Sequence, residues 1–253
     1  MTSTRTYSYS PVFRAIEIAS IISFVVFSGL LAIDSVKAML GPFRGDVWWL
    51  LPTSLLLGYL IADLVSGTVH WLADNFGTED MPILGAALIR PFREHHVDPR
   101  AITRHDFIET NGANCLVCVP WLASYWMWIE PGQNLWTLSF VVTWVWFNWG
   151  IFMTNQFHKW AHLEQPAGWI TWLQDHKLIL SPAHHDIHHT PPFDRYYCIT
   201  TGWLNPVLCD RLRFFQRLEA VIRWAIRAPK AAPGAVPPEM MLTRAVAPAD
   251  QAL

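Results

Sequence analysis

Four long apolar stretches restrict what this chain can fold into. They cover residues 15–33, 47–69, 115–129 and 135–157, and the third is the shortest. A helix needs about 20 predominantly apolar residues to cross the hydrocarbon core of a bilayer, and these stretches reach or approach that length. The composition agrees, because 52% of the residues are hydrophobic and only 15% are charged, unlike in an ordinary soluble domain. We therefore predict an all-α, polytopic membrane protein with about four transmembrane helices.

Basic residues indicate the orientation of these helices. The connection between the second and third stretches is rich in arginine, whereas the first connection holds only Lys37 and Arg44, and residues 130–134 hold no basic residue. Positive charge is retained on the cytoplasmic side of a membrane. We therefore expect both termini and the second connection in the cytoplasm, in a bacterial inner membrane or the endoplasmic reticulum depending on the source.

The rest of the chain is organised around one domain. Residues 1–10 form a short polar tail, residues 11–227 form the predicted membrane-embedded domain, and residues 228–253 are rich in proline and alanine. The last segment has too few large apolar residues to bury a core, so we predict that it is disordered. Amphipathic patterns predict an interfacial helix over residues 168–180 and a basic surface helix over residues 206–226.

Eleven histidines form the strongest chemical signal in the sequence. Residues three or four apart share a helix face, so the members of each close cluster can point at a common centre. A single metal ion rarely takes more than four to six protein ligands, so nine suitably placed imidazoles predict two ions held mainly by nitrogen. The candidates for such ligands are the pair His158 and His162, the cluster His184, His185, His188 and His189, the group His95, His96 and His105, and the single His70. The orientation predicted above places them on one side, as a cytoplasmic, histidine-rich di-metal cap.

Three further residues are less clearly assigned by the sequence. Asp63, Ser66, His70 and Asp74 recur at intervals of three or four residues and form a polar stripe that starts at the end of the second apolar stretch and continues beyond it. Asp74, the last of them, is expected to be a ligand or an acceptor that orients an imidazole. A helix that points the neighbouring histidines inward turns His184 partly aside, so its role stays open. His176 stands alone among polar residues, and we do not expect it to bind metal.

The types of ligand narrow the choice of metal. The cysteines Cys115 and Cys118 lie inside an apolar stretch and are interpreted as buried thiols, so soft sulfur ligands are missing. Clustered carboxylates, which magnesium and calcium prefer, are missing too. Iron and zinc remain. A zinc hydrolase normally uses three protein ligands, whereas two irons can activate O2 and remove hydrogen from an unactivated methylene.

Several ordered blocks of sequence resemble the Kua family of lipid desaturases, in particular its members that form vinyl ether lipids. The resemblance extends over about residues 55–218 and is carried by residues 62–71, 89–112, 155–162, 184–189 and 198–205. It implies an enzyme with two iron ions that uses O2 and two electrons to remove two hydrogens next to the ether oxygen of an alkyl phospholipid. The iron ligands that the resemblance implies are His70, His95, His96, His105, His158, His162, His185, His188 and His189. Asp74 and His184 are candidate supporting residues.

The resemblance also implies partners. The substrate is a membrane ether phospholipid, whose phosphate we expect near cytoplasmic arginines such as Arg90, Arg93 or Arg104. No flavin, haem or ferredoxin module is recognisable in the sequence, so we expect a cytochrome b5-like or ferredoxin-like electron donor. No nucleic-acid partner is expected.

Alternatives remain open at this point. The chain can be an acyl-lipid desaturase or hydroxylase of the same membrane class. It can also be a histidine-rich metal-binding membrane protein without catalysis, such as a transporter or a scaffold. A transporter predicts ligands distributed through the bilayer, whereas the predicted ligands gather on one side.

Overall fold

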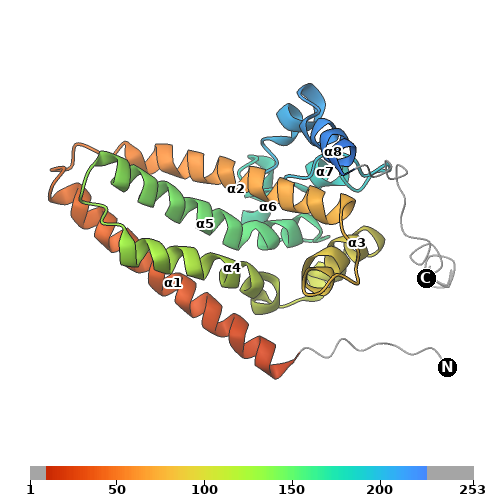
Figure 1. Cartoon of the computed structure of the whole chain (residues 1–253), viewed down its shortest axis with the longest axis horizontal. Helices are drawn as coiled ribbons and strands as arrows, with labels where there is room; N and C mark the ends of the chain where they lie inside the picture. The colour runs from red at the N-terminus through yellow and green to blue at the C-terminus, as the bar shows by residue number, and fades with distance from the viewer. Residues whose placement is uncertain (1–9, 227–253) are drawn as a thin grey trace. The chain divides into compact units, whose positions relative to one another are not determined.

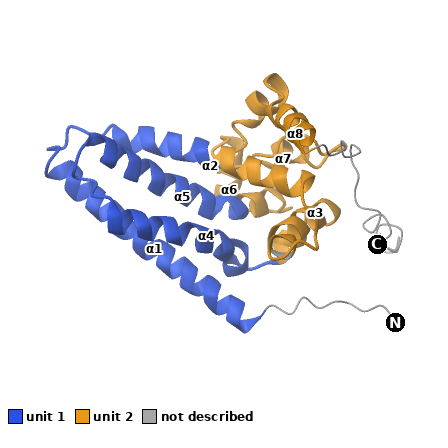
Figure 2. Cartoon of the chain, viewed as in Figure 1, with its two compact units in different colours: residues 1–62, 105–156 blue, residues 63–104, 157–253 orange. Residues whose placement is uncertain are grey.

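The computed structural model describes residues 10–226, without the side chains of residues 86 and 87 (Figure 1). Within this range the chain is helical and contains no strand, which confirms the all-α prediction. The predicted disordered tail, residues 228–253, lies outside the described residues, as does all but Ser10 of the predicted polar tail. The chain divides into two compact units (Figure 2). Unit 1 contains residues 1–62 and 105–156, and unit 2 contains residues 63–104 and 157–253.

Unit 1 is built from four long helices. It contains α1 (Pro11–Leu40) and α4 (Phe107–Trp128), together with the first parts of α2 (Leu50–Asn75) and α5 (Leu135–Ala161), which both end in unit 2. Among the described residues, three helices are long and apolar enough to cross a membrane, namely α1, α2 and α5. The 22-residue α4 corresponds to the third and shortest apolar stretch but is not among them, so the predicted fourth span is not confirmed.

Close helix contacts hold unit 1 together. Buried side chains of α1, α4 and α5 form one apolar core, which includes Phe24, Cys118 and Phe152. Gly112 of α4 lies directly against Glu17 of α1, and a Cβ atom at Gly112 would come within 2.4 Å of the Glu17 Cβ. Only a glycine permits so close an approach of the two helices.

The outer surface of α1 is apolar. Large side chains on this helix, such as Ile22, Val25 and Ile33, are at least half exposed. Contiguous exposed apolar surface of this kind is unfavourable in water but suits contact with lipid chains. The composition of the helices and their exposed apolar side chains together identify a membrane protein.

Unit 2 consists of short helices joined to the ends of α2 and α5. In chain order these are the π-helix η1 (Gly85–Ile89), α3 (Arg90–Val97), the 3-10 helix η2 (Ala101–Arg104), α6 (Gly168–Asp175), α7 (Pro182–Asp186), the π-helix η3 (Pro206–Arg211) and α8 (Phe214–Ala225). The helix predicted over residues 168–180 is shorter in the structure, since α6 ends at Asp175. The helix predicted over residues 206–226 is interrupted at Arg213, whose φ of 48° is left-handed and ends the run of right-handed helix.

The polar stripe on α2 fixes a largely irregular segment, residues 195–205, against this helix. The buried carboxylate of Asp63 accepts hydrogen bonds from the backbone N–H groups of Thr201 and Gly202, both at 2.8 Å, and of Leu204 at 3.1 Å. Ser66 Oγ accepts another from the backbone N–H of Ile199 at 3.2 Å. Buried N–H groups in a segment without secondary structure need such partners. The stripe thereby defines the position of residues 195–205 along α2.

Candidate metal centre

Eight histidines and one aspartate converge in unit 2. They come from four parts of the chain: the C-terminal end of α2, helix α3, the C-terminal end of α5 with the turn after it, and α7 with the turn after it. The structure sorts them into two groups, each with its potential ligand atoms within 4.8 Å of one another. The five-histidine group contains His95, His158, His162, His185 and His189. The four-residue group contains His70, Asp74, His96 and His188.

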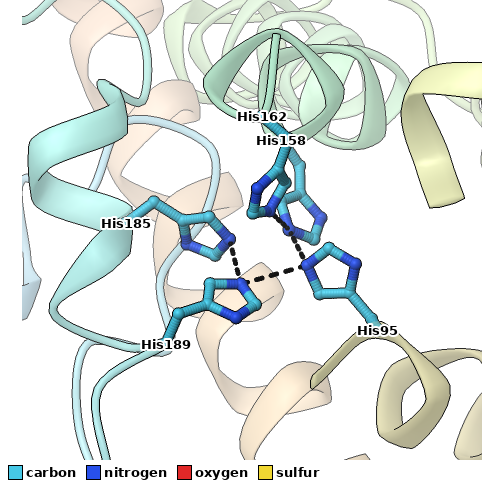
Figure 3. Close-up of side chains that lie close together, drawn as sticks. All are labelled: His95, His158, His162, His185 and His189. Atoms are coloured by element: carbon cyan, nitrogen blue, oxygen red, sulfur yellow. Dashed lines mark hydrogen bonds between the residues drawn. The ribbon is translucent and has the colours of Figure 1, made fainter. Parts of the chain in front are cut away.

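The rings of the five-histidine group point toward one another, as Figure 3 shows. Their Nε2 atoms form a continuous series of short contacts. The Nε2 of His158 lies 3.3 Å from that of His162 and 2.9 Å from that of His95. The Nε2 of His189 lies 3.1 Å from that of His95 and 3.0 Å from that of His185.

Hydrogen bonds alone cannot satisfy this series. A ring nitrogen of neutral histidine carries either one hydrogen or one lone pair, never both. Yet the Nε2 atoms of His95, His158 and His189 each contact two other Nε2 atoms. Five converging lone pairs repel one another unless a cation lies among them, so the arrangement indicates a metal site.

In the four-residue group, three imidazoles surround one carboxylate. The Oδ2 of Asp74 lies 3.4 Å from the Nε2 of His70, 3.2 Å from that of His96 and 3.5 Å from that of His188. The Nε2 atoms of His70 and His188 and both carboxylate oxygens of Asp74 are buried and have no hydrogen-bond partner among the described residues. Buried polar atoms without partners are rare in folded proteins, and an ion among these four side chains would supply the missing contacts.

Carbonyl groups of residues 195–205 set the tautomers of two histidines in this group. The Nδ1 of His70 lies 3.1 Å from the carbonyl oxygen of Tyr197, and the Nδ1 of His188 lies 2.9 Å from that of Arg195. A carbonyl only accepts, so each Nδ1 carries the hydrogen and each Nε2 keeps its lone pair. Backbone acceptors of this kind commonly orient metal-binding histidines.

Two pairs of consecutive histidines divide between the groups. His95 and His188 each have a neighbour, His96 and His189, that belongs to the other group. Consecutive residues of a helix point about 100° apart. Each pair therefore links the two groups through one short piece of backbone, which places the groups side by side.

Five histidines that lie beyond the long helices are neutral at pH 7, namely His95, His162, His185, His188 and His189. Burial lowers the pKa of His95, His185 and His188 well below the usual value of 6.5. Burial, with Arg100 nearby, lowers the pKa of His162 to about 4, and burial with neighbouring histidines lowers that of His189 to about 3. A neutral imidazole is the form that binds metal.

The spacing of the nitrogens fits a metal ion. Nitrogens bound about 2.1 Å from a zinc-like cation lie about 3.0 Å apart at a right angle and about 3.4 Å apart at a tetrahedral angle. The four Nε2 to Nε2 contacts of the five-histidine group, from 2.9 to 3.3 Å, lie close to this range. Both groups consist of nitrogen and oxygen donors, which suits iron or zinc better than Cu(I).

Three other histidines lie outside both groups. His105, a predicted ligand, has a side chain that is 44% exposed, and its Nε2 lies 3.7 Å from Glu109 Oε1. His184 lies 3.0 Å from Asn205 Nδ2, measured from its Nε2. His176 is exposed, and its Nδ1 contacts the carbonyl oxygen of Trp172 at 2.8 Å. The structure thus includes Asp74 in a group and leaves out His105, whose role as a ligand stays a prediction.

The sequence analysis missed the residues that support the ligands. The polar stripe contained Asp63 and Ser66, but their partners are backbone N–H groups about 135 residues away in the chain, which spacing along one helix does not reveal. The carbonyl groups of Arg195 and Tyr197 carry no side-chain signal at all. Two polar residues one and two turns before a predicted ligand were the available indication of a supporting segment.

Comparisons with known proteins identify a family whose matched region contains these residues. A family described as lipid desaturase domain matches residues 59–231, which include both groups. The chain is similar to plasmanylethanolamine desaturase from Myxococcus xanthus, with 49% identity over 86% of this chain and 74% of that protein. It is 50% identical to plasmanylethanolamine desaturase 1 from Mus musculus over 67% of this chain.

A more distant similarity extends to plants. The chain is 33% identical to the chloroplastic fatty acid desaturase 4 from Arabidopsis thaliana over 76% of its length. The matched regions cover less than two thirds of the mouse and Arabidopsis proteins, at 64% and 57% of their lengths. No solved structure matches the chain.

Proposed function

On the premise that the chain belongs to the lipid desaturase family, we propose that it forms vinyl ether lipids. Its substrate would be plasmanylethanolamine, an ether phospholipid with an alkyl chain, and its product a plasmalogen. The reaction removes one hydrogen from each of the first two carbons of the alkyl chain, counted from the ether oxygen. O2, two electrons and two protons enter, and two molecules of water leave together with the vinyl ether. The names of the two relatives that are about 50% identical support this choice of substrate.

The convergence of imidazole nitrogens in two adjacent groups carries the proposal. One iron would be held by the five-histidine group and the other by His70, Asp74, His96 and His188. Two bound irons would supply the activation of O2 that amino-acid side chains cannot perform. Zinc also fits the donor atoms but does not exchange electrons, so the reaction favours iron.

The residues around the metals have three tasks. The buried rings, such as His70 and His188, exclude water from the centre, as their complete burial indicates. The carbonyl groups of Arg195 and Tyr197 hold the Nδ1 hydrogens and keep the Nε2 lone pairs directed inward. Asp74 supplies the negative charge of the four-residue group, which offsets part of the charge of a bound cation.

The proposed orientation follows from the basic residues of the sequence. Both termini and the metal centre would face the cytoplasm, with the alkyl chain of the substrate entering from the bilayer. The electrons would come from a cytochrome b5-like or ferredoxin-like donor that docks on the cytoplasmic side.

Expression in a host without vinyl ether lipids tests the proposal. The host is fed an alkylglycerol, supplied with an electron donor, and grown with and without air. Wild type should form lipids that release aldehydes in mild acid, and only aerobically. His188→Ala should form none, because it removes a buried nitrogen of the four-residue group. His176→Ala is the matched control, since His176 is exposed and lies outside both groups, and it should retain product formation. Equal product from wild type and His188→Ala would contradict the proposal.

A second candidate function is the desaturation of an acyl chain. It is favoured by the 33% identity to fatty acid desaturase 4 from Arabidopsis thaliana. The same lipid analysis distinguishes the two, because an acyl-lipid desaturase would introduce a double bond that releases no aldehyde in mild acid.

A further inference from the structure

A cavity of about 400 Å³ lies beside the five-histidine group in unit 2. One wall is formed by residues 97–100, where α3 ends, and another by residues 161–164, where α5 ends. His162 and His189 line the cavity, and both belong to the five-histidine group. A molecule in this cavity would therefore contact two of the proposed metal ligands.

Some charged residues of the cavity form ion pairs, and one does not. Arg100 forms an ion pair with Glu164, and Asp98 forms one with Arg104 at 2.6 Å. Asp186 also lines the cavity, but its carboxylate forms no hydrogen bond or ion pair within residues 10–226. Among the described residues, Arg100 is the guanidinium that lines the cavity, and a phosphate would share it with Glu164, whereas the carboxylate of Asp186 is available to an additional cation.

These two charges suit a zwitterion that carries a phosphate and an ammonium group. Arginine binds phosphate through two parallel N–H donors, and a carboxylate accepts hydrogen bonds from an ammonium group. The arginines expected from the sequence to bind phosphate do not line the cavity. Arg90 pairs with Glu79 at 3.6 Å, and Arg93 donates to the carbonyl oxygen of Gly77 at 3.0 Å.

The reach of the substrate also fits the position of the cavity. In an alkyl ether phospholipid, a chain of about six bonds of about 1.5 Å separates the reacting carbon from phosphorus, which limits their separation to about 8 Å. The headgroup must therefore lie close to the metal centre while the alkyl chain reacts. Ala161, the last residue of the candidate membrane span α5, lines the cavity, so the cavity lies at the depth where a headgroup is expected.

We propose that this cavity binds the phosphoethanolamine headgroup of the substrate, with the phosphate on Arg100 and the ammonium group on Asp186. This inference rests on the proposed function and assigns headgroup recognition to named residues. It makes two separable predictions, because phosphate is common to ethanolamine and choline lipids, whereas only ethanolamine can donate N–H hydrogen bonds to a carboxylate.

Binding to metal-free protein tests the inference independently of catalysis. The probes are 1-O-alkyl lysophosphatidylethanolamine and its choline counterpart, added to the purified full chain in maltoside micelles. Wild type should prefer the ethanolamine lipid. Asp186→Asn should bind the ethanolamine lipid about tenfold more weakly than wild type, as expected for the loss of one charge-assisted hydrogen bond. Its affinity for the choline lipid should change little. Arg100→Gln should lower the affinity for both lipids by about tenfold.

Matched controls remove the same charges outside the cavity. Asp175→Asn and Arg217→Gln change exposed residues of α6 and α8 and should leave both affinities unchanged. Asp186→Lys inverts the charge and should abolish the preference for ethanolamine. Soluble glycerophosphoethanolamine, which has the headgroup without the alkyl chain, should bind far more weakly, and equal binding would refute a lipid-specific site.

The outcomes distinguish the two proposals. If wild type forms vinyl ether lipids but Asp186→Asn and Arg100→Gln bind both probes like wild type, the headgroup site is wrong and the function stands. If the variants bind as predicted but wild type forms no vinyl ether lipid, the headgroup site stands and the reaction must be another one on an ethanolamine lipid.

Discussion

Replacing Asp63 by asparagine should weaken one metal site selectively, although Asp63 is not in either ligand group. Its carboxylate accepts three backbone N–H hydrogen bonds from residues 201, 202 and 204. Hydrogen bonds to a charged acceptor contribute about 1.5–3 kcal/mol each. An amide oxygen can accept only two of the three and carries no full charge, so we expect Asp63→Asn to lose about 3 kcal/mol of folding free energy.

The effect on metal binding follows from what residues 195–205 contact. The carbonyl groups of Arg195 and Tyr197 orient His188 and His70, which both belong to the four-residue group. Loss of an orienting partner typically lowers metal affinity by about 10–100-fold. In Asp63→Asn, the ion of the four-residue group should therefore be lost first, while the five-histidine group retains its ion.

The assay is the metal-to-protein ratio after dialysis against increasing chelator, together with the midpoint of thermal unfolding. Asp175→Asn, an exposed aspartate at the end of α6, is the matched control and should behave like wild type. If Asp63→Asn keeps the wild-type midpoint and releases both ions at the same chelator concentration as wild type, the supporting role of residues 195–205 is refuted.

Two further predictions concern acid and packing. Burial lowers the pKa of His162 to about 4 and of His189 to about 3, so in the metal-free chain they are neutral when folded but take up protons when unfolded below about pH 6.5. The unfolded state then binds more protons, so thermal unfolding at graded pH should show stability falling from pH 6.5 toward pH 4; a flat profile would contradict the buried, neutral rings. Gly67→Ala should lower the free energy of unfolding by about 1–3 kcal/mol, because the added Cβ would approach Cys198 Sγ to 2.5 Å. Gly29→Ala, with no atom within 4 Å of the added Cβ, should cost nothing, and equal denaturant midpoints for the two variants would show that residues 195–205 do not pack against α2 as described.

Much of the fold could be predicted from local patterns. The apolar stretches at residues 15–33 and 135–157 lie within α1 and α5, and the stretch at residues 47–69 overlaps α2 from Leu50 onward, because hydrophobic length determines such helices. The break at Arg213 could not be predicted, since the amphipathic pattern continues through it and only Leu212 and the left-handed Arg213 separate η3 from α8. The fourth span remains unconfirmed because α4 is long enough but less apolar.

The sequence could predict which residues belong to the candidate site but not how they divide into two groups. Spacing along a helix, sequence clusters and the polar stripe together indicated eight histidines that the structure brings together. The division of His95 from His96 and of His188 from His189 depends on contacts between distant segments, so no local pattern reveals it. His105 shows the limit of reasoning from sequence clusters, because it follows His95 and His96 closely yet lies outside both groups.

The metal content of purified protein tests the central claim most directly. Wild type should contain two iron ions per chain. Asp74→Ala removes a member of the four-residue group and His162→Ala a member of the five-histidine group, so each variant should retain one ion. A wild type that binds one ion or none, or two variants that both keep two ions, would contradict a paired metal centre built from these two groups.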